Sequence, residues 1–518
     1  MELKVNREMI PVTESILDEL QEQSVELDYV LPDYHPDIFR IIGCSCTPTI
    51  CSYSIGAERM TYEMEAEIRV LYCGAESNQV QCICRKWNVS KTIDLPRSCE
   101  NPIVHIQPKT DYVNCRAVNP RRLEVRGAIS VKIKLTGERK QEVICDIFGL
   151  HTQLRKCTVS YAAQKRHVTK NIVLNEEMEL GSAKPDILQI VRCDARVQPG
   201  EQSILAGKLI VKGEVAVRVL YTCESDGAPG MEAIQFPIPY SQIVDMEQID
   251  DSFHGMAQIQ VVHCNCKPVT AKDGTLHTLQ CETELRLICT AVQSATTQLV
   301  TDAFSTLHPC AYTTIPLQID QEPIPVQSAF VCKTTVPGGD SKVEYVYDLQ
   351  CRVKNINTTL QPQSGSIRIS GMLCCNLLAG DADGMPMMLE KEEAFEVYTV
   401  SADAVAEAAR FHGDVRPADC TYHLSADGSV SVTANLQLDG QLFPSAQHTC
   451  LSQLEIDESK KLIRDGDYAL KLYYGVEQEA IWDIAKRYST SVQAIMEEND
   501  LTEERLTEPG MLLIPIVC

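Results

Sequence analysis

The sequence predicts a mainly β protein, with three tandem β-sandwich-like domains followed by a small C-terminal module of order βααβ. Three observations lead to this class: a phrase that recurs at a fixed shift, segments in which polar and apolar residues alternate, and a change of pattern near residue 470. The length of 518 residues fits three or four domains.

The recurring phrase reads LPDYHPDIFRII in its first copy and LGSAKPDILQIV in its second. Residues 36–38 and 185–187 both read Pro-Asp-Ile and lie 149 positions apart. Residues 69–72 and 218–221 both read Arg-Val-Leu-Tyr and keep the same shift of 149. Two matched phrases without a net insertion between them predict a duplicated unit of about 150 residues, which is the size of a domain.

A third, weaker copy follows the first two. Residues 330–332 (Phe-Val-Cys) are matched to residues 190–193, and residues 370–373 to residues 212–215. The two shifts differ, so we expect an insertion near residues 337–339.

The repeats alternate between polar and apolar residues with a period of two. This pattern is found in residues 65–72, 123–133, 282–288 and 430–438. Such segments, separated by turn signals, predict antiparallel sheets packed as sandwiches. Two connecting helices are also expected, at residues 13–23 and 401–411. In the first of them apolar side chains share one face, namely those of Ile16, Leu17 and Leu20.

These patterns place the repeats at residues 1–150, 151–302 and 303–451, a polar linker at 452–467 and the C-terminal module at 468–518. Each repeat is large enough for a hydrophobic core of its own. We therefore expect three separate β-rich domains.

In the C-terminal module, residues 481–488 carry apolar side chains at the spacing i, i+3, i+4 and i+7, and residues 492–499 repeat that spacing. This predicts two short helices, the second of them capped by Ser491. Strands are expected before and after them, at residues 470–476 and 511–517.

Charge excludes two classes of partner. The chain holds 71 acidic and 47 basic residues, a formal charge of −24, which would repel both a phosphate backbone and anionic lipids. We expect no nucleic acid partner and no membrane insertion, because no segment approaches the roughly 18 apolar residues that span a bilayer. The N-terminus has no apolar core of a signal peptide, so we expect the chain to stay in a cytoplasm.

The 24 cysteines are unusual for a reducing compartment. Three interpretations are open: filling of the core, later cross-linking between chains, and a metal site. The close pairs have CxC or CC spacing rather than CxxC, so we predict no stoichiometric zinc and no obligatory disulfide under reductant. These pairs are Cys44/Cys46, Cys82/Cys84, Cys264/Cys266 and Cys374/Cys375.

An enzyme would need a catalytic constellation. The sequence contains no GxSxG, HExxH, P-loop or GxGxxG motif, and His35, His105 and His151 have no motif around them. Asp37 and Asp186 belong to different repeats, and each follows a proline, which favours a turn. We interpret the repeated phrase as a folding signal at the start of each repeat, and we predict no catalytic residues and no cofactor.

The C-terminal residues 481–492, with Glu498-Asn499, Pro509-Gly510 and Ile514-Pro515, resemble the LysM module. LysM modules are βααβ binders of glycans that contain N-acetylglucosamine. The resemblance covers essentially all of residues 470–517.

Two loops depart from the LysM pattern. Residues 478–480 (Gln-Glu-Ala) stand where the family usually has Gly-Asp-Thr, and Asp500 replaces the usual Gly. These loops form the sugar groove of the family, so the module contacts either a glycan or a protein partner. The binding residues that the resemblance implies are Leu470, Val476, Gln478, Glu479, Ala480, Trp482, Asn499, Asp500 and Leu501.

Trp482 allows two interpretations. It lies about 100 degrees around its helix from Ile481, at the flank of the apolar face. It either packs against the strands of the module or presents its outer face as the anchor for a partner, with Leu470 and Lys460-Lys461 as neighbours in that contact.

The phrase LPDYHPDIFRII resembles the start of the SPOCS domain, which occurs in repeats in endospore-forming bacteria, often ahead of a LysM module. Three SPOCS-like units with a terminal LysM-like module resemble the spore-coat morphogenetic proteins of the clostridial lineage. The resemblance implies a non-enzymatic adaptor of coat assembly. Its LysM module would bind the morphogenetic ATPase at the base of the coat, and the chain would also bind other spore coat proteins.

The same resemblance implies a location in the mother-cell cytoplasm at the forespore surface and later in the spore coat. The alternative is a LysM protein that binds peptidoglycan, the cortex or another N-acetylglucosamine glycan.

Overall fold

The computed structural model describes residues 3–74, 79–98, 100–181, 183–198, 200–205, 207–225, 228–270, 274, 276–339, 342–361, 366–400, 408–462 and 469–515. The protein is mainly β, with two short helices near its C-terminal end. No helix among these residues is both long enough and apolar enough to cross a membrane.

The elements follow in the order β1 (Lys4–Val30), β2 (Ile38–Ile55), β3 (Arg59–Gly74), β4 (Val80–Asp94), β5 (Glu100–Asn119), β6 (Arg122–Phe148), β7 (Thr152–Glu179), β8 (Gln189–Val197), β9 (Glu201–Leu205), β10 (Lys208–Ser225), β11 (Ala228–Asp245), β12 (Phe253–Val269), β13 (Thr278–Ser305), β14 (Cys310–Asp320), β15 (Ile324–Val336), β16 (Tyr345–Gln361), β17 (Ser366–Gly380), β18 (Pro386–Val400), β19 (Ala408–Leu424), β20 (Val430–Ile456), β21 (Leu470–Gly475), α1 (Ile481–Tyr488), α2 (Val492–Glu498) and β22 (Gly510–Pro515).

Six antiparallel sheets form the larger part of the molecule, two for each repeat range. The first range supplies β1-β6-β5 and β2-β3-β4, and the second supplies β7-β13-β12 and β11-β10-β8, with β9 beside β10. In the third range β20 pairs with β14, β15 and β19, while β16-β17-β18 form the other sheet. β13 and β20 run a few residues beyond the predicted boundaries at 302 and 451.

The alternating pattern of the sequence is what buries one face of each sheet. In β3 every second residue from Met60 to Tyr72 is buried, while polar residues such as Thr61 and Glu63 lie between them. Successive side chains of a strand point to opposite faces, so one face packs into the core. The two sheets of each repeat enclose one large hydrophobic cluster in this way.

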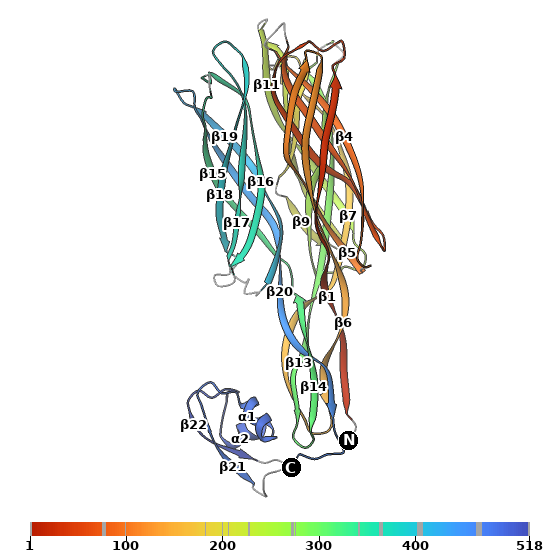
Figure 1. Ribbon diagram of the computed structural model, residues 1–518, viewed down its shortest axis with the longest axis vertical. Helices are drawn as coiled ribbons and strands as arrows, with labels where there is room; N and C mark the ends of the chain where they lie inside the picture. Colours follow the sequence, from red (N-terminus) through yellow and green to blue (C-terminus); the bar gives the residue numbers. More distant parts are fainter. Residues whose placement is uncertain are drawn as a thin grey trace.

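The three repeats also share buried surface. One cluster at the narrow end of the body joins residues of all three repeats, among them Val143, Leu299 and Cys450. Figure 1 shows this part as a stalk in which β1, β6, β13, β14 and β20 run side by side. The expectation of separate domains did not include this shared core.

At the wide end the repeats contact one another in a cycle. β4 of the first repeat meets β8 of the second, β11 of the second meets β16 of the third, and β18 of the third meets β2 of the first. A small cluster there includes Cys82, Leu220 and Leu378, one from each repeat. The repeats thus form a closed ring of three.

The repeated Pro-Asp-Ile phrase leads into β2 in the first repeat and into β8 in the second, each of which belongs to the second sheet of its repeat. The hydroxyl of Tyr72, which is fully buried, donates a hydrogen bond to the carbonyl of Pro36 at 3.2 Å. Tyr221 donates in the same way to Pro185 at 3.4 Å. The phrase is held by a residue of the other matched segment, Arg-Val-Leu-Tyr, which is why both segments keep their spacing.

The predicted helix at residues 13–23 is wrong, because these residues belong to β1, which pairs with β6. A bulge between Ser15 and Leu17 shifts the alternation, so that Ile16 and Leu17 are both buried. Leu20 is 69 % exposed. The bulge therefore imitates the apolar spacing of a helix. Of the other predicted helix, residues 401–407 lie outside the described residues, and residues 408–411 belong to β19.

In the third repeat two shorter strands, β14 and β15, take the place of the single long strand that is β1 in the first repeat and β7 in the second. β14 and β15 pair with β20 one after the other, with residues 321–323 between them. Residues 330–332 lie on β15, so their predicted match with residues 190–193 is wrong. The strand that corresponds to β8 is β16. The match of residues 370–373 with residues 212–215 makes β17 the counterpart of β10. This agrees with the topology, because each of the two strands lies between two others in its sheet.

Candidate functional site

The C-terminal module has the predicted order of strand, helix, helix and strand. Ile481, Ile484 and Ala485 of α1 are buried, as the helical spacing requires. The side chain of Ser491 caps α2 by accepting a hydrogen bond from the backbone N–H of Ala494 at 3.0 Å. The module thereby sets two loops side by side, one before α1 and one after α2.

In the first loop the residues predicted for binding serve the fold. The carboxylate of Glu479 accepts hydrogen bonds from the hydroxyl of Tyr473 at 2.7 Å and from the backbone N–H of Val476 at 3.1 Å. Gln478 has a left-handed backbone, with φ 66°. Ala480 is buried and precedes the first residue of α1. Glu479 and Ala480 are therefore not free to face a ligand.

In the second loop Asn499 is also engaged. Its Nδ2 donates to the carbonyls of Ile495 and Leu513 at 2.7 Å each, and its Oδ1 accepts from the N–H of Leu513 at 2.7 Å. Asp500 has φ 52°, the left-handed conformation that favours glycine. Leu501 packs against the core of the module.

A groove of about 700 Å³ lies beside this second loop. Two of the predicted residues, Asp500 and Leu501, line it, and three carboxylates give it an acidic wall. The residues that line it are Gln153, Val492, Gln493, Met496, Glu497, Asp500, Leu501, Thr502 and Glu504.

Trp482 contacts another part of the same chain, which neither interpretation from the sequence predicted. Its indole N–H donates to Oδ2 of Asp302 at 2.8 Å, and its ring meets the ring of Phe304 edge-on at 5.0 Å. Lys486 adds an ion pair to Asp302 at 2.7 Å. Trp482 is only 6 % exposed. These contacts dock α1 onto the end of β13, at the base of the stalk.

An exposed apolar stripe covers the outer face of the two-stranded sheet. Leu470 and Val476 were predicted as binding residues, and they lie in this stripe together with residues that were missed, Leu472, Tyr474 and Met511. Tyr474 and Met511 are direct cross-strand partners. The exposed fractions are 44 % for Leu470, 67 % for Leu472, 69 % for Tyr474, 59 % for Val476 and 68 % for Met511. The alternation in LKLYYGV, residues 470–476, was the sequence signal that could have found Leu472 and Tyr474.

The contact of Asp302 with Trp482 and Lys486 predicts that docking of the C-terminal module depends on pH. Burial opposes the charged form of Asp302, but hydrogen bonds from Lys486, Trp482 and Tyr312 outweigh burial and hold the pKa of this carboxyl below its usual value. The docked state therefore gains stability above the ordinary carboxyl pKa of about 3.9, and it loses this gain as the pH falls through the lower pKa of the docked state. We expect the module to undock on acidification below about pH 4.

The fluorescence of Trp482 measures this, in a Trp87→Phe background that leaves it as the only tryptophan. A shift of its emission to the red on acidification is expected. The Asp302→Asn variant should show the shifted emission already at neutral pH. The same acid transition in both proteins would contradict the role of Asp302.

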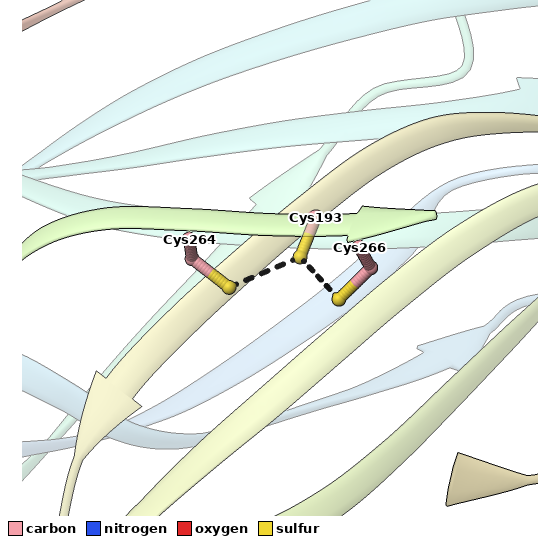
Figure 2. A group of neighbouring side chains, drawn as sticks. All are labelled: Cys193, Cys264 and Cys266. Atoms are coloured by element: carbon pink, nitrogen blue, oxygen red, sulfur yellow. Dashed lines mark hydrogen bonds between the residues drawn. The ribbon is translucent and has the colours of Figure 1, made fainter. Parts of the chain in front are cut away.

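Three cysteine side chains lie close together at a second place, in the body of the molecule. The Sγ atom of Cys193 lies 3.1 Å from that of Cys264 and 3.2 Å from that of Cys266. Figure 2 shows the three side chains pointing toward one another. The three Sγ atoms lie within 4.8 Å of one another, a spacing that would suit a metal ion only if all three were free thiols.

That no disulfide is obligatory under reductant stays a prediction. Only Cys193 and Cys264 of this group are free thiols, because a disulfide joins Cys266 to Cys281. The two residues lie directly opposite in the register of β12 and β13, a relation that CxC spacing does not reveal.

Part of the chain matches a known family. The family model described as SipL, SPOCS domain covers residues 186–269. This supports membership of that range in the SPOCS domain family. The range begins within the second Pro-Asp-Ile phrase and contains β8 to β12, including the three cysteines of Figure 2. The match points to a protein related to sporulation. No curated protein and no solved structure matches the chain.

Proposed function

We propose that the chain is a non-enzymatic adaptor of spore coat assembly, which holds coat proteins at the forespore surface through protein contacts. The observation that carries this proposal is the exposed apolar stripe on β21 and β22. The SPOCS match of residues 186–269 supports the link to sporulation.

The stripe suits a protein surface. Large apolar side chains that form one continuous exposed patch mark interaction sites in soluble proteins, and aromatic anchors such as Tyr474 often dominate the binding energy. Within the described residues, β21 and β22 pair only with each other. Their outer edges can therefore also accept a strand of a partner.

The partner we propose for the stripe is the morphogenetic ATPase at the base of the coat, with other spore coat proteins binding the repeats. The resemblance to LysM-containing coat proteins supports this choice. The proposed location is the mother-cell cytoplasm at the forespore surface, and later the coat itself.

The alternative is binding of peptidoglycan or another glycan by the LysM-like module, which the groove of about 700 Å³ beside α2 favours. Two observations weigh against it. Glu479 and Asn499, from the two loops that form the sugar groove in LysM modules, are engaged in hydrogen bonds within the module. The carboxylates of Glu497, Asp500 and Glu504 line the groove, and a neutral glycan gains little from them.

The test compares capture of the coat-base ATPase by the full chain and by a Leu472→Ser, Tyr474→Ser double variant. Both side chains are exposed, so the module should stay folded, and we expect capture to fall by at least about ten-fold, as for hot-spot residues. Leu20→Ser is the matched control, because Leu20 is 69 % exposed and Leu472 67 %.

The same proteins are incubated with peptidoglycan sacculi. Unchanged capture of the ATPase by the double variant, together with retention on sacculi, would favour the glycan alternative over the adaptor.

A further inference from the structure

The shift of 149 residues that relates the first two repeats also relates their cysteines. Cys44 corresponds to Cys193, and Cys115 corresponds to Cys264. The match of residues 212–215 with residues 370–373 on β17 gives a shift of 158 residues between the second and third repeats. By this shift Cys193 corresponds to Cys351. These residues lie on strands with the same place in each repeat, which are β2, β8 and β16 for the first cysteine and β5 and β12 for the second.

In the third repeat the second cysteine of the pair is Cys420. This residue lies on β19, which pairs with β20 as β12 pairs with β13 and β5 with β6. The two cysteines are separated by 71, 71 and 69 residues in the three repeats.

Each pair brings its two thiols together. In the second repeat the two Sγ atoms lie 3.1 Å apart. In the first repeat the pKa of the Cys44 thiol is raised, chiefly by its hydrogen bond with Cys115 and then by burial. In the third repeat hydrogen bonds with Cys375 and Cys420, followed by burial, raise the pKa of the Cys351 thiol.

Each pair also crosses from one sheet of its repeat to the other. In each repeat the first cysteine lies in one sheet, on β2, β8 or β16. The second cysteine lies in the other sheet of the same repeat, on β5, β12 or β19. The six side chains pack on the core between the sheets. We propose that each repeat carries an inter-sheet dithiol, and that oxidation closes it to the disulfides Cys44–Cys115, Cys193–Cys264 and Cys351–Cys420.

A pair, rather than a larger set, is what the three repeats have in common. The position of Cys266 is taken by Ala117 in the first repeat, and Cys266 is bonded to Cys281. Cys375 is the cross-strand neighbour of Cys351 within one sheet. A structural zinc site takes four ligands, usually thiolates and imidazoles, and two thiols shared by all repeats fall short of that number. A disulfide needs only two.

The reaction with a small disulfide such as oxidised glutathione balances. In the second repeat the thiolate of Cys264 attacks one sulfur of glutathione disulfide, which forms a mixed disulfide and releases the first glutathione thiolate. Cys193 then loses its proton, and its sulfur attacks Sγ of Cys264, which forms the S–S bond and releases the second glutathione thiolate. The protein loses two electrons and two protons, and glutathione disulfide gains them as two thiols.

The first attack falls to the same member of each pair. The hydrogen bond from its partner lowers the pKa of the thiol of Cys115, of Cys264 and of Cys420. The lower pKa raises the fraction of thiolate, which is the nucleophile in thiol–disulfide exchange.

The test uses the full chain, purified under reductant and then treated with oxidised glutathione. The protein is unfolded in an alkylating reagent, and its peptides are mapped by mass spectrometry. Besides the Cys266–Cys281 link of the structure, we expect three cross-linked peptide pairs, each lighter by two hydrogens than the reduced pair. The Cys264→Ser variant should lose only the Cys193–Cys264 link, which leaves Cys193 alkylated and the links of the first and third repeats intact. Cys84→Ser, which removes an exposed cysteine outside the pairs, should keep all three.

The wild-type map decides the proposal even if a variant does not fold. Dominant links of Cys193 to Cys266, links mainly between chains, or six alkylated cysteines after oxidation would overturn it. Zinc bound to the purified chain and lost on the Cys264→Ser substitution would overturn it as well, because it would assign the thiols of the second repeat to a metal site.

Discussion

Replacing Asp348 with alanine is expected to lower the free energy of unfolding by about 3 kcal/mol or more. The side chain of Asp348 on β16 is fully buried, and its carboxylate pairs with Arg192 on β8 and, at 2.7 Å, with Arg218 on β10. The contact joins the third repeat to the second. Alanine would remove the fully buried carboxylate from both guanidinium groups and leave Arg192, which is 14 % exposed, with only its pair to Asp194 at 2.6 Å. Removal of one member of a buried ion pair is strongly destabilising.

Urea unfolding measures this loss, and hydrogen exchange locates it, with faster exchange expected in β8 and β16. Glu344→Ala is the control, because it breaks the pair of Glu344 with Lys342, whose side chains are 42 % and 53 % exposed. An exposed pair contributes at most about 1 kcal/mol. Equal effects of Asp348→Ala and Glu344→Ala would show that the buried pair does not hold the repeats together.

Trp482→Ala should be the most damaging single change in the C-terminal module. The side chain belongs to the module core and also carries the docking contact with Phe304 and Asp302. Truncation of a buried tryptophan removes packing worth about 3 to 5 kcal/mol. We expect the module to undock and its helices to exchange amide hydrogens much faster.

Two further variants separate the core role of Trp482 from its docking role. Trp482→Phe keeps a ring against Phe304 but loses the N–H donor, so a smaller loss is expected. Asp302→Asn lies outside the module and should weaken docking while exchange in α1 and α2 stays slow. Slow exchange and intact docking in the Trp482→Ala variant would contradict both roles.

The sequence was a good guide where one local pattern determined the structure. The spacing of Ile481, Ile484 and Ala485 predicted α1, and the alternation in residues 65–72 predicted a half-buried strand. It failed at β1 because a bulge near Ile16 changes which residues face the core, and a bulge depends on the partner strand β6.

The candidate site was less predictable, because its contacts join distant parts of the chain. Trp482 meets Asp302 across 180 positions, and no local pattern in the sequence indicates that pairing. Glu479 and Asn499 were chosen from their place in loops, but the structure shows that their side chains hold those loops. The cysteine pairs were visible in principle, since the shift of 149 residues relates Cys44 to Cys193.

The closed ring of repeats has a consequence for valency. Three identical chains arranged in this way would present three copies of every surface and three C-terminal modules. A single chain with fused repeats presents three blades whose sequences are free to diverge, and one module at the stalk (Figure 1). In the proposed adaptor role such a molecule would have two unlike ends, one with three different repeat surfaces and the other with a single module. It would therefore connect unlike layers rather than grow into a symmetric lattice.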